Sequence, residues 1–143
     1  MEVDPEVLAR IPHRPPFLWV DRIIGHDQAS ITTSKHFAAD LDVFRGHYPH
    51  APIVPGVILC EAIFQSGALL MSFLHPSPGP TTVPVLTRIG GARFKRLVVP
   101  GNDIVIRVSL QEFIAGVCIM KGTAKVDGKT AVQVEFNCAL TSS

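Results

Sequence analysis

Strict alternation of apolar and polar residues dominates the C-terminal part of the chain. Apolar residues occupy every second position in two runs, at 104, 106, 108 and 110 and at 132, 134, 136, 138 and 140. A period of two is typical of a β-strand that buries one face. Asp127-Gly128, which precedes the second run, is a strong signal for a two-residue hairpin turn. The pattern therefore predicts antiparallel strands that pack by one side against a core.

A different pattern runs from Val57 to Leu74, where apolar residues fall on every side of a helix. Such a helix should be buried around most of its circumference. Five or more strands and one long buried helix predict an α+β fold in which an antiparallel sheet wraps around the central helix. Neither a repeat nor a linker divides the chain, so we expect a single domain over residues 1–143.

Turn residues and prolines mark the remaining elements. Asp4-Pro5-Glu6 predicts the start of a short helix that stops before Pro12. The segment 38–55 contains three prolines and should be irregular. The other predictions are strands over 17–24 and 30–37 with a turn at 25–27, strands or strand ends over 84–89 and 93–99, and a loop formed by Pro76, Pro78, Gly79 and Pro80.

Composition and charge exclude several classes of function. With 47% hydrophobic and 17% charged residues, the chain is not intrinsically disordered. Its 13 basic and 12 acidic residues give a net charge of +1, which argues against a nucleic-acid partner. We find no apolar run that approaches the roughly 20 residues needed to cross a bilayer, and therefore expect no membrane insertion. The first residues also lack the basic and apolar regions of a signal peptide.

Cysteine usage indicates a reducing compartment. The three cysteines are odd in number, widely spaced and flanked by apolar residues, unlike a disulfide framework or a zinc site: Cys60, Cys118 and Cys138. We expect a soluble cytoplasmic protein. The surplus of apolar residues suggests that part of the surface is buried against another subunit of a homo-oligomer.

Candidate chemistry is concentrated between residues 44 and 65. His47 lies in a loop stiffened by prolines, and Glu61 follows in the second turn of the apolar helix. Apolar surroundings make Glu61 costly to ionise and should raise its pKa, so that it can donate a proton. Gln65 lies on the same helix face at i+4, and Gly56 lies at the helix N-terminus, where free N–H groups can hold a carbonyl oxygen. This set suits proton removal beside a carbonyl with loss of a β-leaving group.

These residues also have plainer interpretations. Glu61 can pair with an arginine, a lone loop histidine is commonly structural, and Gln65 can be a satisfied core residue. His47 and His50 are spaced like metal ligands, but no neighbouring Cys or Asp set completes a site, so we expect no metal. No role is assigned to the remaining histidines, which have no chemical constellation around them: His13, His26, His36 and His75.

Four motifs follow one another along nearly the whole chain. They are Pro12-His13-Arg14-Pro15-Pro16-Phe17-Leu18 with Val20-Asp21-Arg22, then Gly46-His47-Tyr48-Pro49, then Pro55-Gly56-Val57 to Glu61-Ala62 and Gln65, and finally Ala92-Arg93-Phe94-Lys95-Arg96 to Val99-Pro100-Gly101. In this order and spacing they resemble the motifs of the 3-hydroxyacyl-[acyl-carrier-protein] dehydratases, the FabZ type of the FabA/FabZ family. That family has the hot-dog fold, which the resemblance therefore implies for this chain.

The resemblance also implies an activity and roles for individual residues. His47 matches the general base, Glu61 the acid, and Gly56 the backbone N–H that polarises the thioester carbonyl. The implied reaction removes water from a (3R)-hydroxyacyl thioester and gives a trans-2-enoyl thioester in fatty acid biosynthesis, without a metal or an organic cofactor. Residues implied to bind substrate are Val57, Phe64, Gln65 and Tyr48.

The implied partners are an acyl carrier protein, with the acyl chain on its phosphopantetheine arm, and further copies of the chain. The family forms homodimers, often three of them in a hexamer. The sequence itself favours a site shared between two chains, because three prolines separate His47 from Gly56. A histidine carried along such a stiff loop need not fold back onto its own helix.

Several residues depart from the family's pattern. Tyr48 replaces Phe, Phe64 replaces a small residue, and Arg45 and His50 stand where Gln and a small residue are usual; further departures lie at Gly90-Gly91, Leu97 and Asn102. The ring of Phe64 predicts a narrowed acyl tunnel and a preference for short or unusual acyl groups. Two interpretations stay open for a set of basic residues, a docking patch for an acidic carrier protein or solvated surface charge: Arg45, Arg88, Arg93, Lys95 and Arg96.

Two other functions remain open at this point. One is an (R)-specific enoyl-CoA hydratase or a hot-dog thioesterase that acts on CoA esters. The other is a non-catalytic acyl-binding paralogue that has kept the fold, against which the intact His47, Gly56 and Glu61 argue.

Overall fold

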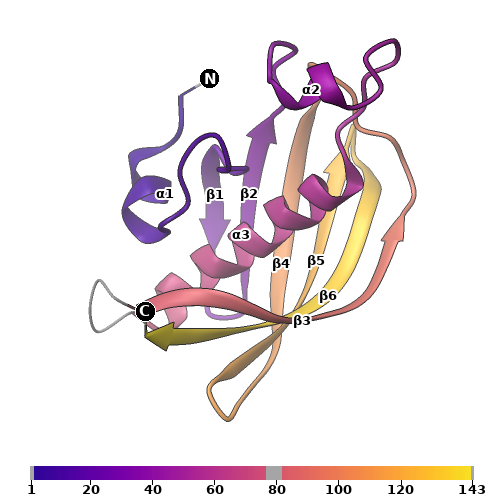
Figure 1. Cartoon of the computed structure of the whole chain (residues 1–143). Helices are drawn as coiled ribbons and strands as arrows, with labels where there is room; N and C mark the ends of the chain where they lie inside the picture. Colours follow the sequence, from indigo (N-terminus) through magenta and orange to yellow (C-terminus); the bar gives the residue numbers. More distant parts are fainter. Residues whose placement is uncertain (1, 77–81, 143) are drawn as a thin grey trace.

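The computed structural model describes residues 2–76 and 82–142, and its main feature is a six-stranded antiparallel sheet that curves around one long helix (Figure 1). The helices are α1 (Pro5–Arg10), α2 (Val43–Gly46) and α3 (Gly56–Leu74). The strands are β1 (Arg22–His26), β2 (Ser30–His36), β3 (Thr82–Phe94), β4 (Asp103–Ile114), β5 (Val117–Val126) and β6 (Lys129–Ser142). Their order in the sheet is β1-β2-β4-β5-β6-β3, so β1 and β3 are the edge strands.

The central helix α3 crosses one face of the sheet diagonally (Figure 1). It contacts β2, β3, β4, β5 and β6, and twelve of its residues between Leu59 and Met71 are buried. The facing strands bury alternate residues, as in β4, where Ile104, Ile106 and Val108 are fully buried. Burial of the apolar helix against the apolar face of each strand confirms the predicted α+β, hot-dog arrangement.

The length of α3 corrects one prediction from the sequence. With 19 residues, α3 is long and apolar enough to cross a membrane by length and composition, although no apolar run was expected to approach that length. However, 67% of its apolar stretch is buried inside the protein, as in the core helix of a soluble fold. The apolar character of α3 is therefore explained by the sheet around it.

Two-residue turns join the last three strands. Asp127 and Gly128 both have positive φ angles, 51° and 75°, which confirms the predicted hairpin between β5 and β6. Ala115 and Gly116 form a similar turn between β4 and β5, with φ angles of 52° and 80°. The sequence pattern did not indicate this second turn, because alanine is an unusual residue in the left-handed region.

The strand predicted over 17–24 is wrong in its first half. β1 begins only at Arg22, because the backbone groups of Phe17 and Trp19 bind the side chain of Gln65 instead of a neighbouring strand. β1 then continues to His26, so the turn expected at 25–27 lies later. There, the Asp27 carboxylate accepts hydrogen bonds of 2.8 Å from the N–H groups of Ala29 and Ser30.

Other boundaries also differ from the predictions. The expected strands at 84–89 and 93–99 are one strand, β3, whose pairing with β6 is irregular between Leu86 and Arg88 and between Ile89 and Ala92. β3 ends at Phe94, and residues 95–99 lie outside it. The segment expected to be irregular, 38–55, contains the short helix α2. The predicted loop residues Pro78, Gly79 and Pro80 lie outside the described residues.

Candidate active site

The carboxyl group of Glu61 is held in the second turn of α3, next to buried residues of the same helix. Its side chain is 23% exposed. Burial raises the pKa of Glu61 above its ordinary value of 4.5, and a hydrogen bond from Gln65 opposes this effect. Burial is the larger cause, as expected from its apolar neighbours, so Glu61 is biased toward the neutral acid.

Gln65 is fully buried, and every polar atom of its amide is hydrogen-bonded. Its Oε1 accepts a bond of 2.8 Å from the N–H of Trp19, while Nε2 donates to the carbonyl of Phe17 at 2.9 Å and to Oε2 of Glu61 at 3.0 Å. These partners fix which end of the amide faces Glu61. Gln65 thus ties the N-terminal arm, residues 11–21, to the carboxyl group, which explains its place in the core better than a substrate contact does.

His13 lies near the start of this arm, beside Glu61. Its Nε2 is 3.9 Å from Oε2 of Glu61, which is too long for a hydrogen bond. Burial and the nearby Arg14 guanidinium lower the pKa of His13, and burial raises that of Glu61. Both shifts favour the neutral form of the group concerned, so burial works against an ion pair between them. The alternative partner for Glu61, an arginine, is not found among the described residues.

Sequence analysis missed His13 as a neighbour of the site. It lies 48 positions before Glu61, and only the tertiary fold brings the two together. The signal available in the sequence was the Pro12-His13-Arg14 motif itself. Arg14 fixes the turn by donating to the carbonyls of Leu8, Ile11 and His13 at 2.7–2.8 Å.

His47 follows α2 directly, in the proline-rich loop that leads to α3. Its Nδ1 is 3.0 Å from the carbonyl oxygen of Ile53. Because a carbonyl only accepts, Nδ1 carries the proton and Nε2 keeps a free lone pair, as a general base requires. Tyr48, with a positive φ of 53°, packs its ring 4.5 Å from the His47 ring and is 62% exposed.

Gly56 begins α3 and is pressed against Phe94. A Cβ atom at Gly56 would lie 2.7 Å from Cε1 of Phe94, so only glycine permits this approach without movement of the ring. Within the described residues, the N–H groups of Gly56 and Val57 make no hydrogen bond, whereas that of Ile58 donates to Pro55. Free N–H groups at a helix N-terminus can hold an oxygen that gains negative charge. The side chain of Val57 is 75% exposed beside them.

Phe64 lies deeper in the molecule. It is 8% exposed, and its ring centroid is 4.9 Å from that of Phe136 on β6. Phe64 is therefore a packed core residue one turn from Glu61.

The single chain does not join the predicted base to the predicted acid. The hydrogen bond of His47 goes to Ile53, and the polar neighbours of Glu61 are Gln65 and His13. No hydrogen bond or ion pair connects His47 with Glu61 in the part of the chain that the structure describes. Gly56, Glu61, Phe64 and Gln65 share α3, while His47 and Tyr48 stand on a separate loop.

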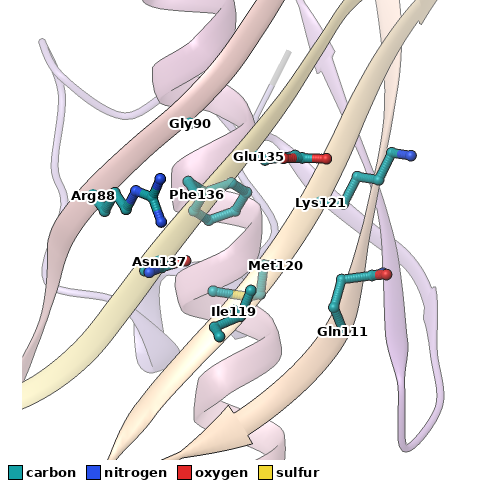
Figure 2. A pocket seen from close by; sticks show the side chains of 9 residues that line it. All are labelled: Arg88, Gly90, Gln111, Ile119, Met120, Lys121, Glu135, Phe136 and Asn137. Carbon is teal, nitrogen blue, oxygen red and sulfur yellow. The ribbon is translucent and has the colours of Figure 1, made fainter.

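A hollow on the sheet is separate from this site. Figure 2 shows its lining residues on the strands, with α3 behind the sheet. The lining is mostly polar and includes no predicted site residue. It consists of Arg88, Gly90, Gln111, Ile119, Met120, Lys121, Glu135, Phe136 and Asn137.

The basic residues singled out in the sequence lie on the surface. Arg88, Arg93, Lys95 and Arg96 are all exposed, and Arg45 pairs with Asp42 at 3.0 Å. Their exposure is compatible both with a docking patch for an acidic carrier protein and with solvated surface charge.

Comparisons with known proteins agree on one family. The model of the FabA-like domain matches residues 11–135. The chain is 39% identical over 138 residues to the 3-hydroxyacyl-[acyl-carrier-protein] dehydratase FabZ of Variovorax paradoxus, covering 94% of this chain and 91% of that protein. It is 37% identical over 137 residues to the FabZ of Albidiferax ferrireducens, with the same two coverages.

Solved structures share the fold at low sequence identity. The dehydratase heterocomplex ApeI:P from Xenorhabdus doucetiae superposes with a TM-score of 0.80 at 13% identity, covering 96% of this chain and 91% of that one. A hypothetical thioesterase with coenzyme A from Streptococcus pneumoniae gives 0.67 at 10% identity, covering 96% and 93%. At these identities the likeness concerns the fold alone.

Proposed function

The chain belongs to the FabA-like family, and we propose that it is a (3R)-hydroxyacyl-[acyl-carrier-protein] dehydratase of fatty acid biosynthesis. The observation that carries this proposal is Glu61, a carboxyl group whose pKa is raised by burial and whose orientation is fixed by Gln65. A neutral acid so held can protonate a leaving hydroxyl group. The product is the trans-2-enoyl thioester.

The proposed reaction uses two side chains and one backbone group. Nε2 of His47 removes a proton from Cα of the substrate, and the N–H of Gly56 stabilises the negative charge on the thioester oxygen. The electron pair of the broken C–H bond forms the Cα–Cβ double bond as the Cβ–O bond breaks. The leaving hydroxyl takes the proton of Glu61 and departs as water. His47 is left protonated and Glu61 ionised, and exchange with solvent restores both.

The arrangement requires a second copy of the chain. His47 makes no hydrogen bond or ion pair with the Glu61 of its own chain, and the edge strand β3 exposes apolar side chains that another copy can cover, among them Val85, Leu86 and Ile89. A two-fold dimer gives each active site His47 from one chain and Glu61 from its partner. Three such dimers can assemble into a hexamer.

The substrate reaches the site on the phosphopantetheine arm of acyl carrier protein, in the cytoplasm. Val57 and Tyr48 are exposed next to Gly56 and His47, and this exposure supports a role for both in binding the acyl-pantetheine chain. Phe64 is packed against Phe136 one turn from Glu61, and we propose that its ring also limits the inner end of the acyl channel. The protein needs no metal or organic cofactor for this chemistry, because proton transfers and one oxyanion contact complete it.

The test supplies a short trans-2-enoyl thioester, on acyl carrier protein and separately on CoA, and measures hydration by loss of enoyl absorbance and by the mass of the product. Faster hydration on the carrier protein is the expected result. His47→Ala and Glu61→Gln should each lower the rate about 10²–10⁴-fold while the chain stays folded. Release of free acid would indicate a thioesterase, a preference for CoA an enoyl-CoA hydratase, and no turnover a non-catalytic acyl-binding protein.

A further inference from the structure

His13 and Glu61 are neighbours for which the proposed reaction has so far no use. Nε2 of His13 is 3.9 Å from Oε2 of Glu61, and the side chains are 24% and 23% exposed. The contact joins the N-terminal arm to α3, close to the hydrogen bonds by which Gln65 links the same two segments. Catalytic hydrogen bonds are often long in a free enzyme and tighten when substrate binds.

The arm that carries His13 is fixed on both sides. Arg14 donates to the carbonyls of Leu8, Ile11 and His13, and Gln65 holds Phe17 and Trp19. A residue fixed in this way approaches Glu61 with a defined orientation, which an exposed loop residue would lack.

The tautomer of neutral His13 follows from its other ring nitrogen. Nδ1 is buried and has no hydrogen-bond partner among the described residues. A proton on Nδ1 would leave a buried donor unpaired, whereas a proton on Nε2 leaves only an unpaired acceptor, which proteins tolerate better. The proton of neutral His13 therefore belongs on Nε2, the ring nitrogen that lies 3.9 Å from Oε2 of Glu61.

Oε2 of Glu61 is consequently the oxygen that receives hydrogen bonds. Nε2 of Gln65 donates to it at 3.0 Å, and Nε2 of His13 lies 3.9 Å from it. The acidic proton of neutral Glu61 then belongs on Oε1, the oxygen free to face the substrate.

The geometry assigns His13 as a positioning residue for Glu61. When Glu61 protonates the leaving hydroxyl, the His13 ring moves closer and its Nε2–H donates a hydrogen bond to Oε2. This hydrogen bond stabilises the negative charge that Glu61 gains. This inference rests on the proposed function, because it needs Glu61 as the acid. A hydrogen bond to a charged group is worth more than one to a neutral group, so the contact favours the transition state over the ground state.

Other titratable groups near the pair do not supply this hydrogen bond. Arg14 directs its guanidinium to backbone carbonyls. On the sheet side, Cys138 of β6 is close enough to interact with Glu61, but burial chiefly raises the pKa of its thiol to about 12, so that it is neutral. Cys118 of β5 is similarly buried next to Cys138.

Three substitutions separate a hydrogen-bond role from a packing role. In His13→Gln, the side-chain amide reaches the position of Nε2 and keeps a donor there. In His13→Asn, the same amide reaches only the position of Nδ1. His13→Phe keeps the size of the ring and removes both nitrogens. His36, whose Nδ1 lies 2.8 Å from Asp103 on another part of the surface, gives the control His36→Gln.

In the dehydration direction, we expect His13→Asn and His13→Phe to lower kcat about tenfold with little change in KM, whereas His13→Gln retains most of the rate. Loss of the donor also destabilises the Glu61 carboxylate and raises its pKa. Dehydration requires protonated Glu61 and falls as pH rises through that pKa. With the 3-hydroxyacyl thioester as substrate, the alkaline limb of the kcat profile therefore moves to higher pH in the Asn and Phe variants. The Gln variant keeps the limb near its wild-type position.

The pKa of Glu61 is also measured without turnover, by carbon NMR of the protein labelled at glutamate carboxyls, with Glu61→Gln for assignment. Equal kcat and equal Glu61 pKa in the Gln, Asn and Phe variants would overturn the inference. If the Phe variant does not fold, the Gln and Asn pair decides alone. A wild-type protein that hydrates no enoyl thioester would refute the proposed function, whereas an active protein indifferent to these variants refutes only the role of His13.

Discussion

The amide of Gln65 donates a 3.0 Å hydrogen bond to Oε2 of Glu61 while its other two hydrogen bonds go to the backbone of the N-terminal arm. One buried side chain thus serves both as a fold contact and as the support of the proposed acid. Residues 17–19 cannot move away from α3 without releasing the carboxyl group of Glu61. Stability and activity should therefore respond together to changes at Gln65.

The first prediction concerns Gln65→Leu. Leucine fills the space but leaves the N–H of Trp19 and the carbonyl of Phe17 without their partners. An unsatisfied buried group costs about 1–3 kcal/mol, so the free energy of unfolding should fall by about 3 kcal/mol. Denaturant unfolding measures it, with exposed Gln111→Leu as the matched control. A loss no larger than in the control would mean that water replaces the amide.

How far the sequence predicts this fold depends on the range of the interactions. The period of two in β4 and β6 and the apolar helix α3 are local patterns, and the structure confirms both. The first half of the strand predicted from Phe17 to Ile24 is wrong because Gln65, more than 40 residues away, satisfies the backbone there. Local propensity cannot register such a partner.

The same distinction applies to the site. Glu61, Gln65 and Gly56 share one helix, so their spacing alone predicts their proximity, and the Gln65–Glu61 hydrogen bond confirms part of it. His13 could not be found in this way, because its only signal was a motif with no visible partner in the sequence. His47 stays a predicted member of the site, since its proposed partner lies on another chain.

The second prediction follows from the raised pKa of Glu61. The folded chain binds this proton more tightly than the unfolded chain, so stability is fully present below pH 4.5 and is lost as pH rises through the folded pKa. Glu61→Gln removes this loss. Its free energy of unfolding relative to wild type should therefore grow between pH 4.5 and neutral pH.

Denaturant unfolding across this pH range tests the prediction, and Glu112→Gln on the exposed part of β4 is the control. A constant difference between Glu61→Gln and wild type would show that burial does not favour the neutral form of Glu61.

The third prediction concerns Phe64, which packs against Phe136. Phe64→Ala removes a buried ring and should cost about 3–5 kcal/mol of stability. Phe64→Leu keeps most of the volume and should cost about 1 kcal/mol. The leucine variant is therefore the better probe of acyl length.

If Phe64 narrows the acyl channel, Phe64→Leu raises kcat/KM for long enoyl chains relative to short ones. Hydration rates over a series of chain lengths measure this ratio, and Phe113→Leu, at a 49% exposed ring, is the control. An unchanged ratio would make Phe64 a core residue without influence on specificity.

The fourth prediction tests whether one active site is built from two chains. His47 is bound to Ile53 in its own loop, and Glu61 is bound to Gln65 on α3, with no polar contact between them. The exposed edge of β3 offers a place where a second copy can pair. An isologous interface makes the exchange reciprocal, so each site takes His47 from one chain and Glu61 from the other.

His47→Ala and Glu61→Ala chains are each inactive as homodimers under this arrangement. When the two are unfolded together and refolded, random pairing makes half of the dimers mixed, and one of the two sites in each mixed dimer receives both native residues. About a quarter of all sites should then be intact, so about a quarter of the wild-type rate should return. Affinity tags of two kinds allow the mixed dimer to be purified and its formation verified. If purified mixed dimers stay inactive while refolded wild type recovers its rate, His47 and Glu61 act within one chain and the shared site is refuted.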